Sequence, residues 1–284
     1  MKKNTSKKII TALAASGVLF SILAIIAQKK KGDSVYAEEA DQKNPMEGKR
    51  VVFVRDDSDP ENADGVRGHL VAIGDSYHQP NIYERYIKRM LDMTLSFFGL
   101  LFLSPVFIGI CLAITIDDPG PVLFTQKRVG KNKRYFKLHK FRSMKMSTPH
   151  DVPTHMLDHP EQYITRVGKF IRAHSLDELP QIWDIFIGNM SVIGPRPALW
   201  NQDLLTAERD LYGANDITPG LTGWAQINGR DELDISEKAK LDGEYKEHLG
   251  LKIDILCFLG SLHVFSKDDS IVEGSNGKTQ DPTQ

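Results

Sequence analysis

The sequence predicts a mixed α+β fold, mainly helical, that is associated with a membrane. Two apolar segments, residues 9–27 and 95–116, are each long enough to enter a bilayer. Elsewhere, short runs of β-branched and aromatic residues predict strands, and apolar residues at helical spacing predict helices. There is no internal repeat, and only two cysteines, Cys111 and Cys257, occur, both in apolar runs, which argues against a disulfide scaffold.

The net charge of -1 averages two regions of opposite sign. Residues 33–64 hold ten acidic and four basic side chains, whereas residues 127–145 hold nine basic side chains and no acidic one. A basic stretch of this kind suits anionic lipid headgroups or a nucleotide. A chain of 284 residues is long enough for one or two domains with a core of ordinary size.

The first element is predicted to be an N-terminal membrane anchor within residues 1–31. Its nineteen uncharged residues at about 1.5 Å each just cover a hydrocarbon core of about 30 Å. The lysine-rich start and the Val35-Tyr36-Ala37 triplet also resemble a signal peptide. Lysines at 29–31 separate the triplet from the apolar core, which favours an uncleaved helix. Lysines on both sides leave its orientation open.

Residues 32–81 are predicted to be an acidic linker or a small appended element, with one strand at residues 50–55. The run at residues 72–76 resembles the nucleophile motif of Gly-Asp-Ser hydrolases. Those enzymes need a late Asp-x-x-His, which this chain lacks, so a turn is the better interpretation.

Residues 82–118 are predicted to form an interfacial segment that leads into a membrane helix. The pair Ser104-Pro105 lies at the middle of the apolar run. Proline removes a helical hydrogen bond, and a neighbouring hydroxyl can satisfy the freed backbone group. A spanning helix and a bent helix that returns to the same face both fit, and the residues alone favour spanning.

Residues 119–268 are predicted to be the main soluble domain, followed by a flexible tail at 269–284. Strands are expected at residues 122–125 and 135–141. Helices are expected at residues 165–172, 176–187, 236–249 and 253–265.

The most informative run in this domain begins at Ser175 and includes the adjacent acids Asp177 and Glu178. Ser175-x-x-Glu178 fits a capping box at a helix start. On a helix the two acids would point about 100° apart, so one could attack while the other holds a metal. A solvated acidic pair is the simpler alternative.

Basic residues supply a second set of candidates. In Gly194-Pro195-Arg196-Pro197, prolines on both sides would aim the arginine at a phosphate at little entropic cost. A rigid loop with an exposed arginine is equally consistent. Further upstream, basic residues alternate with apolar ones at Lys127, Arg128, Lys140 and Arg142. An amphipathic strand on lipid headgroups also fits them, whereas the membrane segments argue against nucleic-acid binding.

Taken together, these motifs resemble the bacterial sugar transferase family, the monotopic phosphoglycosyl transferases. The resemblance covers about residues 86–265, with the motifs in order. They occupy residues 120–130, 136–144, 175–181, 190–197 and 219–230. Asn189 departs from the family, which usually has an aspartate at this position.

The resemblance implies a re-entrant helix broken at Ser104-Pro105 and a catalytic domain on the cytoplasmic face of a bacterial inner or plasma membrane. It implies transfer of a sugar-1-phosphate from a UDP-sugar to undecaprenyl phosphate with release of UMP, the first membrane step of a surface glycan such as a capsule or exopolysaccharide. Asp177 matches the family nucleophile and Glu178 the acid associated with Mg2+.

The resemblance also assigns phosphate binding to Arg196 within its Gly194–Pro197 loop and places Arg230 near the nucleotide. Lys127, Arg128, Lys140 and Arg142 complete the substrate-binding candidates. A polyprenyl glycosyltransferase that releases UDP and a non-catalytic membrane scaffold are the alternatives. The sugar and the existence of a homodimer are left open.

Overall fold

The computed structural model describes residues 42–56, 68–148, 160–229 and 233–265. The predicted anchor, the predicted tail and Arg230 lie outside the described residues. The chain divides into two compact units, each considered by itself below. Unit one contains Leu91–Gln126 and Lys137–Ile187, and unit two contains Ala40–Met90, Lys127–Phe136 and Gly188–Gln284.

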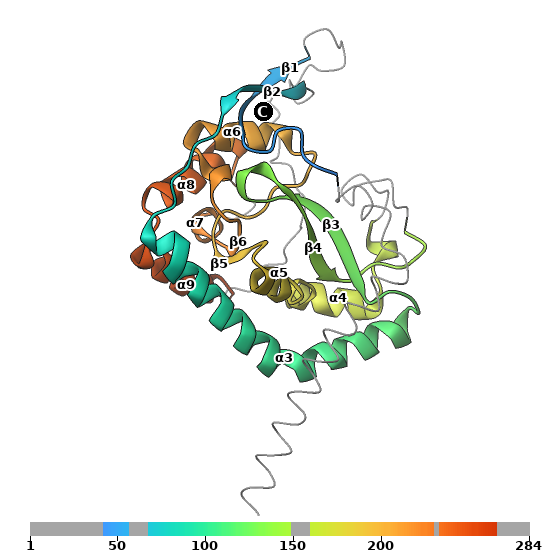
Figure 1. Cartoon of the computed structure of the whole chain (residues 1–284). Coiled ribbons are helices and arrows are strands. Elements are labelled where there is room, and N and C mark those ends of the chain that lie inside the picture. The colour runs from blue at the N-terminus through green and yellow to red at the C-terminus, as the bar shows by residue number, and fades with distance from the viewer. Residues whose placement is uncertain (1–41, 57–67, 149–159, 230–232, 266–284) are drawn as a thin grey trace, which may run out of the picture. The chain divides into compact units, whose positions relative to one another are not determined.

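The fold is mixed α+β and mainly helical, as the sequence predicts (Figure 1). In the described residues the strands form three two-stranded sheets. These are antiparallel β1 (Lys49–Arg55) and β2 (Gly68–Asp75), β3 (Leu123–Val129) with β4 (Tyr135–Phe141), and parallel β5 (Ser191–Ile193) and β6 (Gly220–Thr222). Sequence analysis missed β2, β5 and β6; the last two have three residues each, too few to show an alternating pattern.

The predicted helices at residues 165–172, 236–249 and 253–265 are confirmed within two residues at each end. In unit one the helical elements are most of α3 (Arg89–Asp117), η4 (Pro160–Tyr163), α4 (Arg166–Ala173), η5 (Leu176–Glu178) and α5 (Gln181–Ile187). In unit two they are η1 (Tyr83–Lys88), η2 (Lys131–Lys133), α6 (Asp203–Tyr212), η6 (Ala214–Asp216), α7 (Trp224–Ile227), α8 (Ile235–Glu247) and α9 (Leu251–Phe265).

The long apolar helix runs through the proline predicted to break it. Together η1 and α3 make a helix of 35 residues, long and apolar enough to cross a membrane. Pro105 cannot donate to the carbonyl of Leu101 four residues earlier, and the buried Ser104 hydroxyl donates to that carbonyl instead, at 2.8 Å. The helix therefore stays continuous, and Figure 1 shows α3 bent near its middle.

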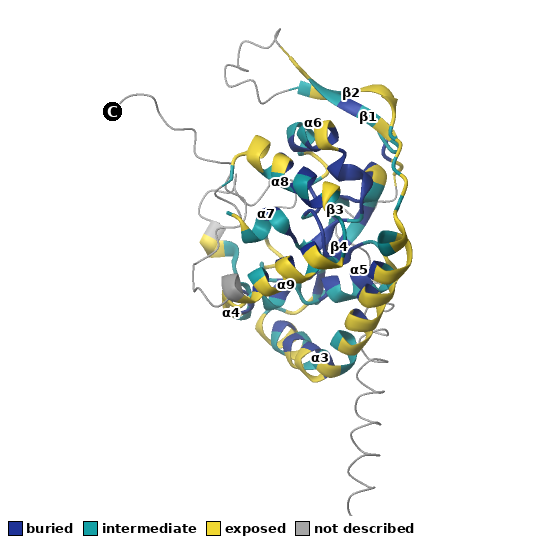
Figure 2. Cartoon of the chain, turned by 90° about the vertical axis from the view of Figure 1, so that its left-hand side faces the viewer, coloured by how far each residue is buried: buried dark blue, intermediate teal, exposed yellow. Residues whose placement is uncertain are grey.

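One face of α3 builds the core of unit one. Phe107 packs against Phe141 of β4 with ring centroids 5.4 Å apart. Figure 2 shows buried and exposed positions alternating along α3. Several exposed positions carry large apolar side chains, among them Phe102 at 73 % and Ile116 at 82 % exposure. The core cluster consists of Phe107, Ile110, Ile114, Leu123, Phe141 and Ile171.

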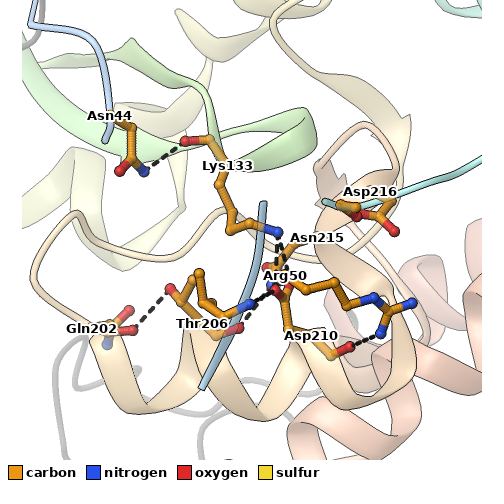
Figure 3. A network of polar contacts seen from close by, with 10 residues as sticks. Asn44, Arg50, Lys133, Gln202, Thr206, Asp210, Asn215 and Asp216 are labelled. Atoms are coloured by element: carbon orange, nitrogen blue, oxygen red, sulfur yellow. Dashed lines mark hydrogen bonds and ion pairs between the residues drawn. The ribbon is translucent and has the colours of Figure 1, made fainter. Parts of the chain in front are cut away.

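A buried ion pair organises unit two (Figure 3). Lys133, at the turn between β3 and β4, is completely buried, and its Nζ lies 2.8 and 3.0 Å from the two carboxylate oxygens of Asp210 on α6. Asn215 Nδ2 donates to the same carboxylate at 2.6 Å, and the backbone N–H of Val51 in β1 donates at 2.8 Å. Arg50 binds the backbone carbonyl of Asp210 at 2.6 Å. The strand pair β1–β2 is thereby joined to α6.

Replacing Lys133 by methionine tests how much the Lys133–Asp210 ion pair contributes to the stability of the protein. Lys133→Met keeps the side-chain length but leaves Asp210 buried without its cation. We expect the free energy of unfolding to fall by about 3–5 kcal/mol, as is usual when one partner of a buried pair is removed. Urea unfolding of the detergent-solubilised protein, followed by tryptophan fluorescence, measures the change.

Lys131→Met is the matched control. Lys131 pairs with Glu84 at 2.8 Å, and its side chain is 38 % exposed, so the loss should be less than about 1 kcal/mol. Similar losses in the two variants would contradict a special role for the buried pair.

Candidate active site

The acid pair lies on a 3-10 turn and not in an α-helix. η5 holds Asp177 and Glu178, and α5 begins only at Gln181. The predicted capping box does not form, because Ser175 has a left-handed backbone with φ of 52° and its side chain makes no capping hydrogen bond. Pro180, which lacks an N–H, stands directly before α5 and separates it from the acidic turn.

A buried lysine holds one acid of the pair. Asp177 is only 6 % exposed. Lys140 of β4 is buried as well, and its Nζ lies 3.2 Å from Oε1 of Glu178. Unit one therefore brings three predicted site residues to one place: the two acids belong to one turn, and Lys140 pairs with the second.

A second contact fixes the same strand to α5, and sequence analysis missed it. Nδ1 of His139 lies 2.8 Å from Oδ1 of Asp184, and the His139 backbone N–H donates to Oδ2 at 2.9 Å. Asp184 is completely buried. Successive residues of β4 thus bind Glu178 and Asp184, so the strand holds the acidic turn and α5 together. The available signal was that Asp184 falls within the helix predicted at residues 176–187.

Arg142 was predicted to bind substrate, and the structure gives it a partner within the protein. Its Nη1 donates to Oδ2 of Asp118 at 2.7 Å, and its Nη2 donates to the Asp118 backbone carbonyl. The backbone N–H of Met146 donates to the same carboxylate at 3.0 Å. Arg142 therefore ties the end of α3 to the segment after β4.

In unit two, the Gly194–Pro197 loop is joined to β6 by backbone hydrogen bonds. Gly194 N–H donates to Thr222 at 2.8 Å, and Gly220 N–H donates to the Pro195 carbonyl at 2.9 Å. A Cβ on Gly194 would lie 2.6 Å from the Thr218 carbonyl oxygen, so this position excludes any side chain.

The other side of the loop is held by the end of β3. The Val129 N–H donates to the Ala198 carbonyl at 2.9 Å, and Nη1 of Arg128 donates to the Pro197 carbonyl at the same distance. Pro195 and Pro197 are buried, whereas Arg196 between them is partly exposed. The loop is therefore a rigid support that presents Arg196, and Arg128 contributes to that support.

Lys127 is enclosed by aromatic rings. Its Nζ lies 4.5 Å from the ring centroid of Tyr135 and 4.8 Å from that of Trp200, and the residue is only 5 % exposed. Contacts of this kind are cation–π interactions. The second ring belongs to the segment just after the Arg196 loop, so Lys127 also fastens that segment.

The chemistry of the acidic turn suits Mg2+. No group of three or more metal-ligating side chains occurs among the described residues. Mg2+ is usually held by one or two carboxylates together with phosphate oxygens of the substrate and water. Asp177 and Glu178 supply that number of carboxylates, so the donor set fits this ion.

A model of the family "Bacterial sugar transferase" matches residues 83–268, about two thirds of the chain. The chain belongs to the bacterial sugar transferase family. The resemblance predicted from the sequence is thereby confirmed. The strand pair β1–β2 precedes the matched region of this sugar transferase.

Similar proteins cover the same part of the chain. An undecaprenyl-phosphate glucose phosphotransferase of Komagataeibacter xylinus is 40 % identical over 178 residues, 59 % of this chain and 34 % of the relative. A UDP-N-acetylgalactosamine-undecaprenyl-phosphate N-acetylgalactosaminephosphotransferase of Aeromonas hydrophila is 35 % identical over 62 % of this chain and 43 % of the relative. The uncharacterized sugar transferase EpsL of Bacillus subtilis is 35 % identical over 60 % of this chain and 84 % of its own. The matched region thus spans only about a third to two fifths of the two phosphotransferases.

The close backbone contact at Gly194 allows a test of whether the loop that carries Arg196 requires a glycine at this position. In Gly194→Ala, the added methyl group must displace the Thr218 carbonyl, and we expect a loss of about 1–3 kcal/mol in unfolding free energy. Gly74→Ala is the control in the same unit, since nothing lies within 4 Å of a Cβ there. Thermal unfolding of both variants checks this, and an unchanged Gly194→Ala would show that the loop tolerates a side chain.

Proposed function

We propose that this sugar transferase moves a sugar-1-phosphate from a UDP-sugar to undecaprenyl phosphate and releases UMP. The observation that carries the proposal is the buried Asp177 beside Glu178, whose carboxylate is held by Lys140 at 3.2 Å. The names of the relatives support this reaction class. Because those names differ in the sugar, the proposal leaves the sugar open.

The transfer proceeds in two displacements. In the first, a carboxylate oxygen of Asp177 forms a bond to the β-phosphorus, and the bond from that phosphorus to the bridging oxygen breaks. The bridging oxygen leaves with the electron pair as part of UMP. In the second, an oxygen of the lipid phosphate attacks the same phosphorus, and the Asp177 carboxylate is released. Neither step needs a proton donor, because phosphate oxygens leave and attack as anions.

Neighbouring residues prepare the turn for this chemistry. Lys140 holds the Glu178 side chain and places a positive charge beside the acids, which offsets the charge of an approaching pyrophosphate. For unit two, we propose phosphate binding at Arg196, whose loop is fixed on both sides by backbone hydrogen bonds. Arg128 and Lys127 act through the support of this loop and not by touching substrate.

Asp177 and Glu178 would hold Mg2+. The bound ion would supply positive charge to phosphate oxygens and so lower the repulsion between substrate and carboxylate.

We further propose that α3 enters the membrane and returns to the cytoplasmic face of a bacterial membrane. The bend near Pro105 and the exposed apolar side chains of α3 support this topology. In unit two, α9 also exposes an apolar stripe at i, i+4 and i+8 positions, suited to a lipid surface. Leu251, Ile255, Leu256, Phe258, Leu259 and Leu262 make up this stripe.

The order of the two displacements can be tested with purified protein and a panel of UDP-sugars without lipid. We expect one UDP-sugar to release UMP in an amount limited by the enzyme, because Asp177 is loaded and not discharged. Asp177→Asn should give no burst while its thermal midpoint stays close to that of the wild type. Adding undecaprenyl phosphate should restore turnover, and chelation of Mg2+ should suppress the burst.

Other outcomes would change the assignment. Release of UDP would favour a glycosyltransferase and contradict the proposal. A UMP signal that requires the lipid would demote Asp177 to a base or metal ligand. The absence of any product with every UDP-sugar and lipid phosphate would favour a non-catalytic scaffold.

The membrane topology can be tested by cysteine labelling on either side of the long helix. Tyr77 and Met146 are 77 % and 44 % exposed, and each is replaced singly by cysteine in a Cys111→Ala background. Burial and the nearby Asp254 raise the pKa of the Cys257 thiol to about 12, so this native cysteine should not compete for the reagent. An impermeant maleimide should label both new cysteines only after the cells are opened. Labelling of one of the two in intact cells would restore the spanning helix.

A further inference from the structure

The buried face of the acidic segment is polar, which is unusual for a core-facing surface. Asp177, Gln181 and Asp184 are 6 %, 1 % and 0 % exposed. Asp177 lies in the 3-10 turn η5, and Gln181 and Asp184 lie in α5, so one short stretch of unit one carries all three. Gln181 thus lies four residues after the proposed nucleophile, and both side chains are buried.

The glutamine on this face is incompletely paired. Asp184 receives two hydrogen bonds from His139. In contrast, Nε2 of Gln181 is buried and has no hydrogen-bond partner among the described residues. A buried donor without an acceptor destabilises a fold, and an apolar side chain of the same size would avoid that cost. Stability of the fold therefore does not explain why a glutamine occupies position 181.

The distribution of such atoms points to an anion. Within the described parts of the chain, four buried side-chain polar atoms lack a partner, of which two are donors and two are acceptors. Both donors, Gln181 Nε2 and Arg142 Nε, belong to unit one, which carries Asp177 and Glu178, whereas both acceptors belong to unit two. An unpaired donor close in sequence to a carboxylate that is to become a phosphoryl ester suits the extra negative oxygens of that ester.

We propose that Gln181 is a further catalytic residue, whose amide N–H donates to a non-bridging oxygen of the phosphoryl group on Asp177. The inference rests on the proposed function. A neutral amide suits this position better than a cation. It stabilises the phosphoryl oxygens by a hydrogen bond but does not pair with the unreacted Asp177 carboxylate strongly enough to slow its attack. No bond to Gln181 forms or breaks, and the donor is buried before the substrate arrives.

The test compares stability with the rate of loading in Gln181→Leu. Leucine fills similar space and removes the unpaired donor, so the thermal midpoint should stay unchanged or rise. The UMP burst should nevertheless be about 10- to 100-fold slower, the usual effect of losing a donor to a charged oxygen. Ile187→Ala, at the exposed end of the same helix, is the control and should keep the wild-type rate.

Gln181→Glu supplies a second, pH-dependent readout. Ionised glutamate cannot donate and repels Asp177, so the burst at about pH 8 should be slower than in Gln181→Leu. Protonated glutamic acid carries an O–H donor. The rate of this variant relative to the wild type should therefore rise as the pH falls to about 6, because burial and the like charge raise the pKa of the new carboxyl group.

The outcomes separate the two proposals. A wild-type protein without a UMP burst contradicts the proposed function. With a wild-type burst present, a normal rate in Gln181→Leu overturns the role of Gln181. A large fall in the thermal midpoint of Gln181→Leu, together with no pH-dependent recovery in Gln181→Glu, would make the glutamine a structural residue and overturn it too.

Discussion

The pairing of Lys133 with Asp210 is the constraint on which unit two depends. Both side chains are buried, so neither charge can be satisfied by water, and each needs the other in a fixed position. The carboxylate also receives hydrogen bonds from β1 and from Asn215. One acid therefore sets the positions of three segments that are far apart in the sequence. The strand pair that precedes the family match is one of them, which makes it part of the fold of this sugar transferase.

Much of this fold could be predicted from the sequence because it depends on local patterns. The composition of α8 and α9 and the Ser104-Pro105 pair are readable within a few residues. The acidic turn and the Arg196 loop were found for the same reason. Their roles as nucleophile and phosphate site were implied by the resemblance and stay predictions until the activity is measured.

Contacts made across long stretches of chain could not be predicted. The basic run at residues 127–145 was interpreted as suited to anions, and the structure adds that Lys133 and Arg142 are buried on Asp210 and Asp118 and that Lys127 is enclosed by aromatic rings. No local sequence pattern around these residues predicts the side chains that they contact. The capping box failed because a left-handed Ser175 and a proline outweighed a favourable local motif.

The basic run consequently carries less available charge than its composition suggests. At least five of its nine cations contact other parts of the protein, and another, Lys140, pairs with Glu178. They include Lys127, Arg128, Lys131, Lys133 and Arg142. A substrate would therefore meet a few cations held in fixed positions, such as Lys140, and not a broad basic surface. Such an arrangement favours orientation over long-range attraction, because fixed charges act at short distance.

The Ser104 hydroxyl satisfies the backbone carbonyl that is left without its helical partner at the proline bend of α3. A proline bend normally exposes a carbonyl that only water or another polar group can satisfy, and such a bend would flex or refill as its surroundings change. Here the adjacent residue, Ser104, which is buried, makes the replacement bond, so the Leu101 carbonyl needs no partner from outside the helix. Two adjacent residues of the sequence thus supply both the bend and the group that satisfies its backbone, without any contact with lipid or nucleotide.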